Sequence, residues 1–262
     1  MKKMIEINIL IFLVGLFAVS CEKEAIKPDL NNIKKREFIS SFETVDDFAN
    51  FYITPQGYKG TTYHELSDSI VYSGTYSHKA WITGTNPPST LLINNNHRGY
   101  PTIQLQNTVK GSFKTPCYIT LWVWLDMELQ ENTSRGDDDW FSFATFTDAE
   151  TDNWDRTVLV NLNHKGFVHL GHVPNQGEQS YIFQTTNLRF PQKEWVKLKI
   201  YLDFRNNGYA KVWQNGQLVS YANLHNIDNK LSQIHFGMYA PPQIANGVIY
   251  NDELKIIEVD GE

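Results

Sequence analysis

The stretch 94–106 carries the residue types best suited to chemistry. Three asparagines lead into a predicted strand, and alternation along that strand separates an apolar face from a polar face. The polar face holds Arg98, Tyr100, Thr102 and Gln104, and His97 stands just before them. Groups that bind anions, transfer protons and form hydrogen bonds therefore share one surface, as a site for an acidic sugar requires.

The elements that must position these groups are predicted to be strands almost throughout. Residues 118–126 and 195–203 alternate apolar and polar side chains, Asn215-Gly216 favours a tight hairpin turn, and 163–166 closes a second hairpin. Further strands are predicted at 70–72, 78–83, 140–146, 157–162, 167–173, 209–213, 218–221, 233–240 and 248–259, and a short helix near 45–50. Many short antiparallel strands without alternating helices predict an all-β fold, a two-sheet antiparallel β-sandwich of the jelly-roll type.

The N-terminus resembles a bacterial lipoprotein signal peptide over residues 1–20. Lysines follow Met1, the apolar segment 9–19 is short for a membrane span, and small residues precede Cys21. The resemblance implies cleavage before Cys21 and diacylglyceryl and palmitate attachment there, whereas an ordinary secretory signal is the alternative. Because Glu22 rather than aspartate follows, we expect a lipid anchor in the outer membrane, on the cell surface or the periplasmic face.

Composition limits the remaining possibilities. Residues 21–37 read as a lipidated cysteine and flexible tether, and 38–262 are long enough for a single jelly-roll domain. Lipidation of Cys21 would leave Cys117 as the sole thiol, so no intrachain disulfide is expected. The formal net charge of -6 argues against a nucleic acid partner, while local basic groups still permit an acidic polysaccharide or oligosaccharide.

Three later motifs resemble the concanavalin A-like jelly-roll proteins of the bacterial polysaccharide-lyase type, which include heparin lyase I and alginate lyases. They are WVKLKIYLD at 195–203, YAKVWQNGQLV at 209–219 and IHFGMY at 234–239, and GTYSHKAW at 74–81 is similar to an early strand of those enzymes. The resemblance implies a carbohydrate-active protein that performs β-elimination on uronic-acid-containing glycans.

The chain departs from that pattern at the catalytic positions. Where alginate-lyase-like members carry a catalytic tyrosine and a lysine two residues later, Gln233 and His235 stand here, although Gly237 and Tyr239 are retained. The arginine-rich strand of those enzymes is also poorly matched at 77–81. We therefore expect the catalytic groups to be redistributed, with the following candidates: His97, Arg98, Tyr100, His235 and Tyr239.

An elimination assigns a role to each of these groups. Removing the proton beside a uronate carboxylate requires neutralisation of that carboxylate, and the guanidinium of Arg98 suits a bidentate pair with it. His97 or His235 would act as the base, and Tyr100 or Tyr239 as the acid or as the base. The reaction would cleave a glycosidic bond or expel a hydroxyl, which leaves a polysaccharide lyase and a sugar dehydratase both open.

Substrate binding and metal binding have their own candidates. Gln104 and Gln233 could bind substrate, and Trp122 and Trp124 could stack on sugar rings on the concave face of the sandwich, although tryptophans covering the convex side look the same in sequence. No cofactor is required. A structural calcium between Glu43 and Asp252 is implied by the resemblance.

Two functions of different classes remain open. One is a lipid-anchored lyase or dehydratase, and the other is a non-catalytic glycan-binding surface lipoprotein. A glycoside hydrolase of the same sandwich class is disfavoured, because no strand shows the paired acids that retaining members use.

Overall fold

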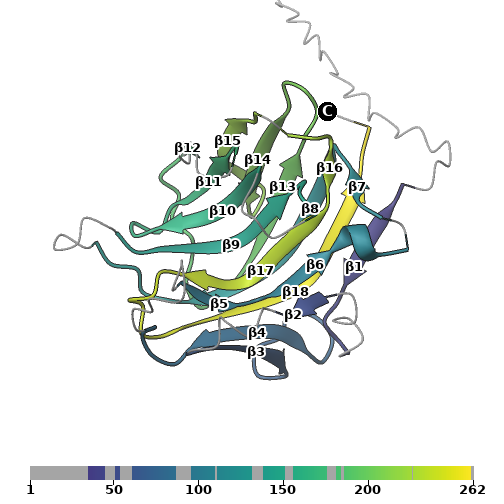
Figure 1. Cartoon of the computed structure of the whole chain (residues 1–262). Coiled ribbons are helices and arrows are strands. Elements are labelled where there is room, and N and C mark those ends of the chain that lie inside the picture. Colours follow the sequence, from purple (N-terminus) through teal and green to yellow (C-terminus); the bar gives the residue numbers. More distant parts are fainter. Residues whose placement is uncertain are drawn as a thin grey trace, which may run out of the picture. The chain divides into compact units, whose positions relative to one another are not determined.

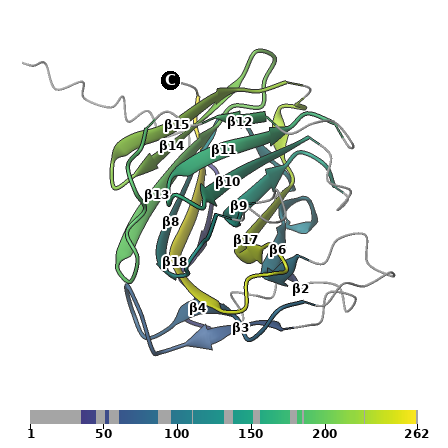
Figure 2. The ribbon, with the colours of Figure 1, turned by 90° about the vertical axis from the view of Figure 1, so that its left-hand side faces the viewer.

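Two antiparallel β-sheets that pack face to face make up the structure, as Figures 1 and 2 show. The computed structural model describes residues 35–44, 51–53, 61–86, 96–109, 111–131, 138–150, 156–175, 181–183, 186–225 and 227–260, with the backbone alone at 51–53 and 181. The predicted signal peptide, Cys21, most of the tether and the predicted helix near 45–50 lie outside these residues. None of the helices in the described part is long and apolar enough to cross a membrane.

Sheet A is built from eight strands. In spatial order these are β15 (Gln217–Asn223), β14 (Tyr209–Gln214), β13 (Trp195–Leu202), β8 (Cys117–Asp126), β18 (Gly247–Glu258), β4 (Ser77–Ile82) and β3 (Thr62–Ser67), while β1 (Glu37–Ser40) also pairs with β18.

Sheet B also has eight strands. In spatial order these are β12 (Tyr181–Phe183), β11 (Val168–Val173), β10 (Thr157–Asn163), β9 (Trp140–Thr147), β17 (Gln233–Ala240), β6 (Pro101–Gln104) and β2 (Phe51–Ile53), while β5 (His97–Gly99) also pairs with β17. A small sheet joins β7 (Phe113–Lys114) to β16 (Lys230–Leu231), and a 3-10 helix, η3, spans Leu105–Asn107.

The core lies between the two sheets and follows from alternation along each strand. On β8, Ile119, Leu121 and Val123 are at most 2% exposed, while the residues between them point outward. Phe146 of β9 and Phe236 of β17 belong to the same buried cluster from the side of sheet B. The predicted all-β, two-sheet antiparallel jelly roll is confirmed.

Most strand and turn predictions are also confirmed. The turn between β14 and β15 has positive φ at Asn215 (48°) and Gly216 (85°), as a type I′ hairpin requires. The predicted strand at 70–72 is wrong, because this segment is a loop whose amides at Tyr72 and Ser73 donate to the Asp252 carboxylate instead of to a neighbouring strand. The predicted strand from Arg98 is divided at Tyr100 into β5 and β6.

Candidate functional site

Five residues form a cross-strand row on the outer face of sheet B. Arg98 on β5 lies opposite Tyr239 on β17, and Tyr239 lies opposite Ser142 on β9. Ser142 in turn lies opposite Asn161 on β10, and Asn161 lies opposite His169 on β11. Direct cross-strand partners share a face, and adjacent strands are about 4.8 Å apart, so the row spans about 19 Å of sheet.

A cavity of about 450 Å³ opens on this face of sheet B. Residues from β9, β10, β11 and β17 form its floor and walls: Trp140, Leu159, Asn161, His169, Gly171 and Tyr239. A cavity of this volume is in the range of small-molecule sites and accommodates a few sugar rings. Aromatic, amide and imidazole groups therefore converge on one open groove.

Four of the five predicted catalytic residues gather at one end of this row. The rings of Tyr100 and His235 stack with their centres 5.0 Å apart, and the ring of Tyr100 meets that of Tyr239 edge-on at 5.9 Å. The guanidinium carbon of Arg98 lies 5.2 Å from the centre of the Tyr239 ring. Within this cluster only Tyr239 also lines the 450 Å³ cavity, and Asn96 donates a hydrogen bond of 3.1 Å to its hydroxyl.

A bulge in β17 brings Tyr239 to this position. The register of β17 against β9 shifts between Phe236 and Tyr239, and Gly237 has a φ of 112° that side chains rarely adopt. A Cβ atom on Gly237 would lie 3.0 Å from the carbonyl oxygen of Gly99. The close approach of β17 to β5, and with it the pairing of Tyr239 with Arg98, therefore depends on a glycine here.

His97, the fifth predicted catalytic residue, points away from the cluster. Its side chain is fully buried, Nε2 donates to the Ile244 carbonyl at 2.7 Å, and Nδ1 lies 3.1 Å from the side-chain amide nitrogen of Asn86. Burial lowers the pKa of His97, while its bonds to the Ile244 and Pro242 carbonyls act in the opposite direction. Strand alternation sets His97 on the inner side of Arg98, so its imidazole does not join the cluster.

The predicted substrate-binding glutamines lie on the same face as the cluster but farther along the strands. Gln104 and Gln233 are direct cross-strand partners. The amide of Gln233 is 1% exposed and donates to the Ala149 carbonyl at 3.2 Å, and the Gln104 oxygen accepts from Asn107 at 2.9 Å. Contacts within the protein thus occupy both side chains, and neither lines the cavity.

The predicted sugar-stacking tryptophans lie on the outer face of the other sheet. Trp122 and Trp124 point outward from β8 in sheet A. The ring of Tyr72 stacks on Trp122 with centres 3.9 Å apart, and the ring of Tyr250 meets Trp124 edge-on at 5.5 Å. Trp140 of β9, which sequence reasoning did not single out, is the tryptophan that lines the groove.

His169 and Asn161 were also missed as site residues. His169 and His172 point to opposite faces of β11: His169 lines the groove, whereas His172 bonds to Thr157 and His225 on the inner side. Burial lowers the pKa of His169, with the Phe167 carbonyl acting in the opposite direction, so its imidazole is neutral near pH 7. Alternation along β11 predicts which side chains share a face with His169. The local sequence does not predict that β11 lies beside β10.

Glu43 and Asp252, the predicted calcium ligands, both bind the loop between β3 and β4. Glu43 accepts from the Thr75 amide at 3.0 and 3.1 Å, and Asp252 Oδ2 accepts from the Tyr72 and Ser73 amides at 3.0 and 3.1 Å. Burial raises the pKa of Asp252 to about 6, against the effect of its backbone hydrogen bonds. These two acids supply few of the roughly six to eight oxygens that calcium requires, so the calcium site stays a prediction.

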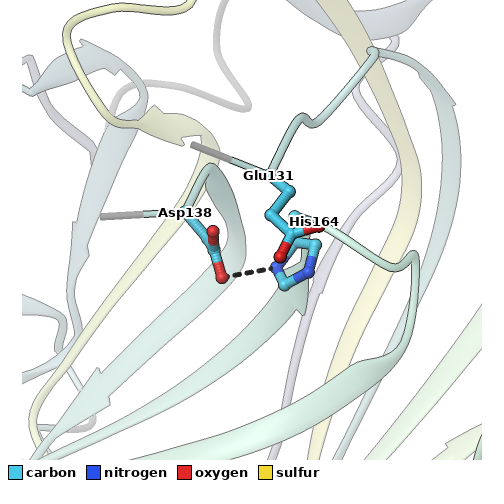
Figure 3. Close-up of side chains that lie close together, drawn as sticks. All are labelled: Glu131, Asp138 and His164. Carbon is cyan, nitrogen blue, oxygen red and sulfur yellow. Dashed lines mark ion pairs between the residues drawn. The ribbon is translucent and has the colours of Figure 1, made fainter. Parts of the chain in front are cut away.

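A second group of possible metal ligands lies at the rim of the groove. Glu131, Asp138 and His164 each offer one ligand atom, and these atoms lie within 4.8 Å of one another (Figure 3). His164 Nδ1 pairs with Asp138 Oδ2 at 3.0 Å, and both residues line the cavity. Carboxylate and imidazole ligands suit a divalent transition metal ion, so a cation could bind here.

The sequence matches no protein-family model and no curated protein. The fold is similar to an endo-β-1,4-glucuronan lyase from the fungus Trichoderma reesei (TM-score 0.56, 13% identity, 81% of this chain and 94% of that chain). It is also similar to the cellulose-induced protein Cip1 (TM-score 0.59, 14% identity, 85% and 97%) and to alginate lyase vAL-1 from Chlorella virus (TM-score 0.51, 10% identity, 75% and 90%). At these identities the similarity establishes the shared fold.

Proposed function

We propose that this protein acts by β-elimination on poly- or oligosaccharides that contain uronic acids. The observation that carries the proposal is the pairing of Arg98 with Tyr239 at the edge of an open groove, with Tyr100 and His235 packed against it. Two proteins of similar fold are, by name, lyases of glucuronan and alginate, which supports this class of substrate.

Each residue of the cluster has a part in the proposed reaction. Arg98 pairs with the uronate carboxylate and stabilises the enolate-like charge that develops when the neighbouring carbon loses its proton. Tyr239 lines the groove, and its hydroxyl oxygen accepts the proton from the carbon while its own proton passes to the departing oxygen. The electron pair of the broken C–H bond forms a carbon–carbon double bond, the carbon–oxygen bond to the leaving group breaks, and the departing oxygen takes up a proton.

The remaining groups orient these two. Asn96 fixes the Tyr239 hydroxyl through its hydrogen bond, Tyr100 packs edge-on against the Tyr239 ring, and His235 stacks on Tyr100. At the far end of the row Asn161 and the neutral imidazole of His169 bind hydroxyl or carboxylate groups of the glycan. The proposed elimination uses these side chains and needs no cofactor.

A non-catalytic glycan-binding role is the second candidate. It is favoured by the burial of the cluster, in which Tyr100, His235 and Tyr239 are 5%, 7% and 8% exposed. Incubation of the purified full-length protein with alginate, glucuronan and their oligomers separates the two candidates. The enzyme produces an unsaturated uronate that absorbs in the ultraviolet, whereas tight glycan retention without this product favours binding alone.

We propose further that Cys21 carries a lipid anchor that holds the protein at the outer membrane. The support is the signal-like sequence 1–20 followed by cysteine. Metabolic labelling with radioactive palmitate should mark the wild-type chain and not Cys21→Ser, and membrane fractionation should place the label in the outer membrane. Recovery of unlabelled wild-type protein would contradict the proposal.

A further inference from the structure

The outer face of sheet A carries an unusual mixture of lysines and aromatic rings. We call six residues on the adjacent strands β8, β13 and β14 the lysine–aromatic surface: Tyr118, Trp122, Lys197, Lys199, Lys211 and Trp213. Lys199 Nζ lies 3.8 Å from the centre of the Tyr118 ring and 5.1 Å from that of Trp213. Lys197 Nζ lies 5.8 Å from the Trp122 ring, and Lys211 Nζ lies 6.0 Å from the Trp213 ring.

Strand register produces this mixture. Lys197 is the cross-strand partner of Trp122, and Lys199 is the partner of Trp213. Two residues along a strand are about 6.7 Å apart, so ammonium groups and rings alternate both along and across the sheet. Charged groups that repeat along and across the outer face of a sheet match a polymer that carries charge at regular intervals.

The charge of this surface is unbalanced. The outward residues of β13 and β14, two strands that the structure describes in full, include no acid. Neither Lys197 nor Lys199 forms an ion pair with any described carboxylate. Elsewhere on sheet A, by contrast, lysines do pair with acids: Lys79 with Glu65 and Lys255 with Glu37. A local positive surface on a chain of net charge -6 favours an anionic ligand.

The lysine–aromatic surface is distinct from the groove. The groove opens on the outer face of sheet B, whereas these residues point outward from sheet A, and the hydrophobic core lies between the two sheets. A polysaccharide segment bound at one surface therefore leaves the other accessible.

We propose that the lysine–aromatic surface is a second, non-catalytic binding site for anionic polysaccharide. The proposal rests on the proposed action on uronate glycans. Ammonium groups pair with carboxylates along the polymer, and the ring edges and exposed ring faces contact the apolar C–H faces of the sugars. The rings are half-buried and interleaved with charge, which disfavours insertion into a lipid bilayer.

Affinity electrophoresis of the full chain through gels containing alginate or glucuronan tests the proposal. The variant Lys197→Gln/Lys199→Gln/Lys211→Gln should bind both polymers about tenfold more weakly, and the difference should shrink as salt is added. Its matched control is Lys35→Gln/Lys114→Gln/Lys230→Gln, which removes the same charge elsewhere and should bind as wild type. Turnover of a short oligosaccharide should be the same in all three proteins.

Three results would overturn the proposal. They are unchanged polymer affinity in the first variant, an equal loss in the control variant, and a loss of binding to anionic lipid vesicles with polymer binding intact. Because retardation in the gel does not depend on turnover, a protein without lyase activity still gives a clear result. Failure to form an unsaturated uronate would contradict the proposed elimination and would leave the proposed binding site on sheet A standing.

Discussion

The guanidinium of Arg98 lies against the ring of Tyr239, with its central carbon 5.2 Å from the ring centre, and the two residues are direct partners across β5 and β17. This contact places a permanent positive charge beside the one phenol of the cluster that lines the groove. An anion that binds Arg98 is therefore held beside the Tyr239 ring. The pairing joins residues that are far apart in the chain and accounts for how the site could combine anion binding with proton transfer.

Arg98→Lys should lower kcat/KM on a uronate oligosaccharide by about a hundredfold, because lysine keeps the charge but loses the bidentate fork. Steady-state kinetics on alginate and glucuronan oligomers measure the effect. Arg189→Lys is the matched control, since Arg189 also lies over an aromatic ring, that of Phe167, but has no contact with Tyr239 among the ring contacts of the described residues. Equal rates for Arg98→Lys and wild type would remove Arg98 from the mechanism.

His169→Gln should raise KM for oligosaccharides by about tenfold and change the thermal midpoint little, since the side chain faces the groove. The control on the same strand is His172→Gln, which faces inward and bonds to Thr157 and His225. This control should lower the thermal midpoint and leave KM unchanged. Equal changes in KM and in the thermal midpoint for the two variants would contradict a substrate-binding role for His169.

His97→Ala should destabilise the fold by about 1–3 kcal/mol, because it removes the buried imidazole hydrogen bonds to the Ile244 carbonyl and the Asn86 amide. Urea unfolding gives this free energy, and activity per folded molecule should stay near the wild-type value. Loss of activity in a variant of unchanged stability would return His97 to the catalytic candidates.

Asp252 should make stability depend on pH in the opposite sense to an ordinary carboxylate. Its pKa in the folded state is about 6, above the value of 3.8 expected in the unfolded chain, so the folded state binds more protons between these values. The free energy of unfolding then falls as pH rises from about 4 to about 6. Urea unfolding across this range should show the fall in wild type and a smaller one in Asp252→Asn.

The same variant tests the calcium prediction. Calcium would favour the ionised carboxylate, so adding it above pH 6 should raise the thermal midpoint of wild type and leave Asp252→Asn unchanged. A midpoint that calcium does not move in either protein would refute a site at Glu43 and Asp252.

The fold follows from sequence wherever alternation is regular. The burial of Ile119, Leu121 and Val123 is what a half-buried strand predicts, and the bounds predicted for 233–240 are those of β17. The loop at 70–72 was mistaken for a strand, because the Asp252 carboxylate that binds its amides comes from a distant segment.

The site could be predicted only in part. Alternation within a strand shows which of its side chains share a face, but the order of strands in the sheet depends on distant segments of the chain. Alternation predicts that Arg98 and Tyr100 share a face, and the structure joins them to His235 and Tyr239 through the pairing of β17 with β5 and β6. No local pattern shows that β10 and β11 continue the same face, so Asn161 and His169 were missed. Trp122 and Trp124 are a similar case. Alternation predicts that they point outward, but it does not predict which of the two sheets contains their strand.

The elimination rate of Tyr239→Phe tests the central claim most directly. Removal of the hydroxyl should lower the rate of unsaturated uronate formation by about a thousandfold, with glycan binding and the thermal midpoint unchanged. Tyr221→Phe, which removes an exposed hydroxyl from β15, should behave as wild type. A Tyr239→Phe protein that forms the unsaturated product at the wild-type rate would contradict the account, as would a wild-type protein that binds these glycans and forms none.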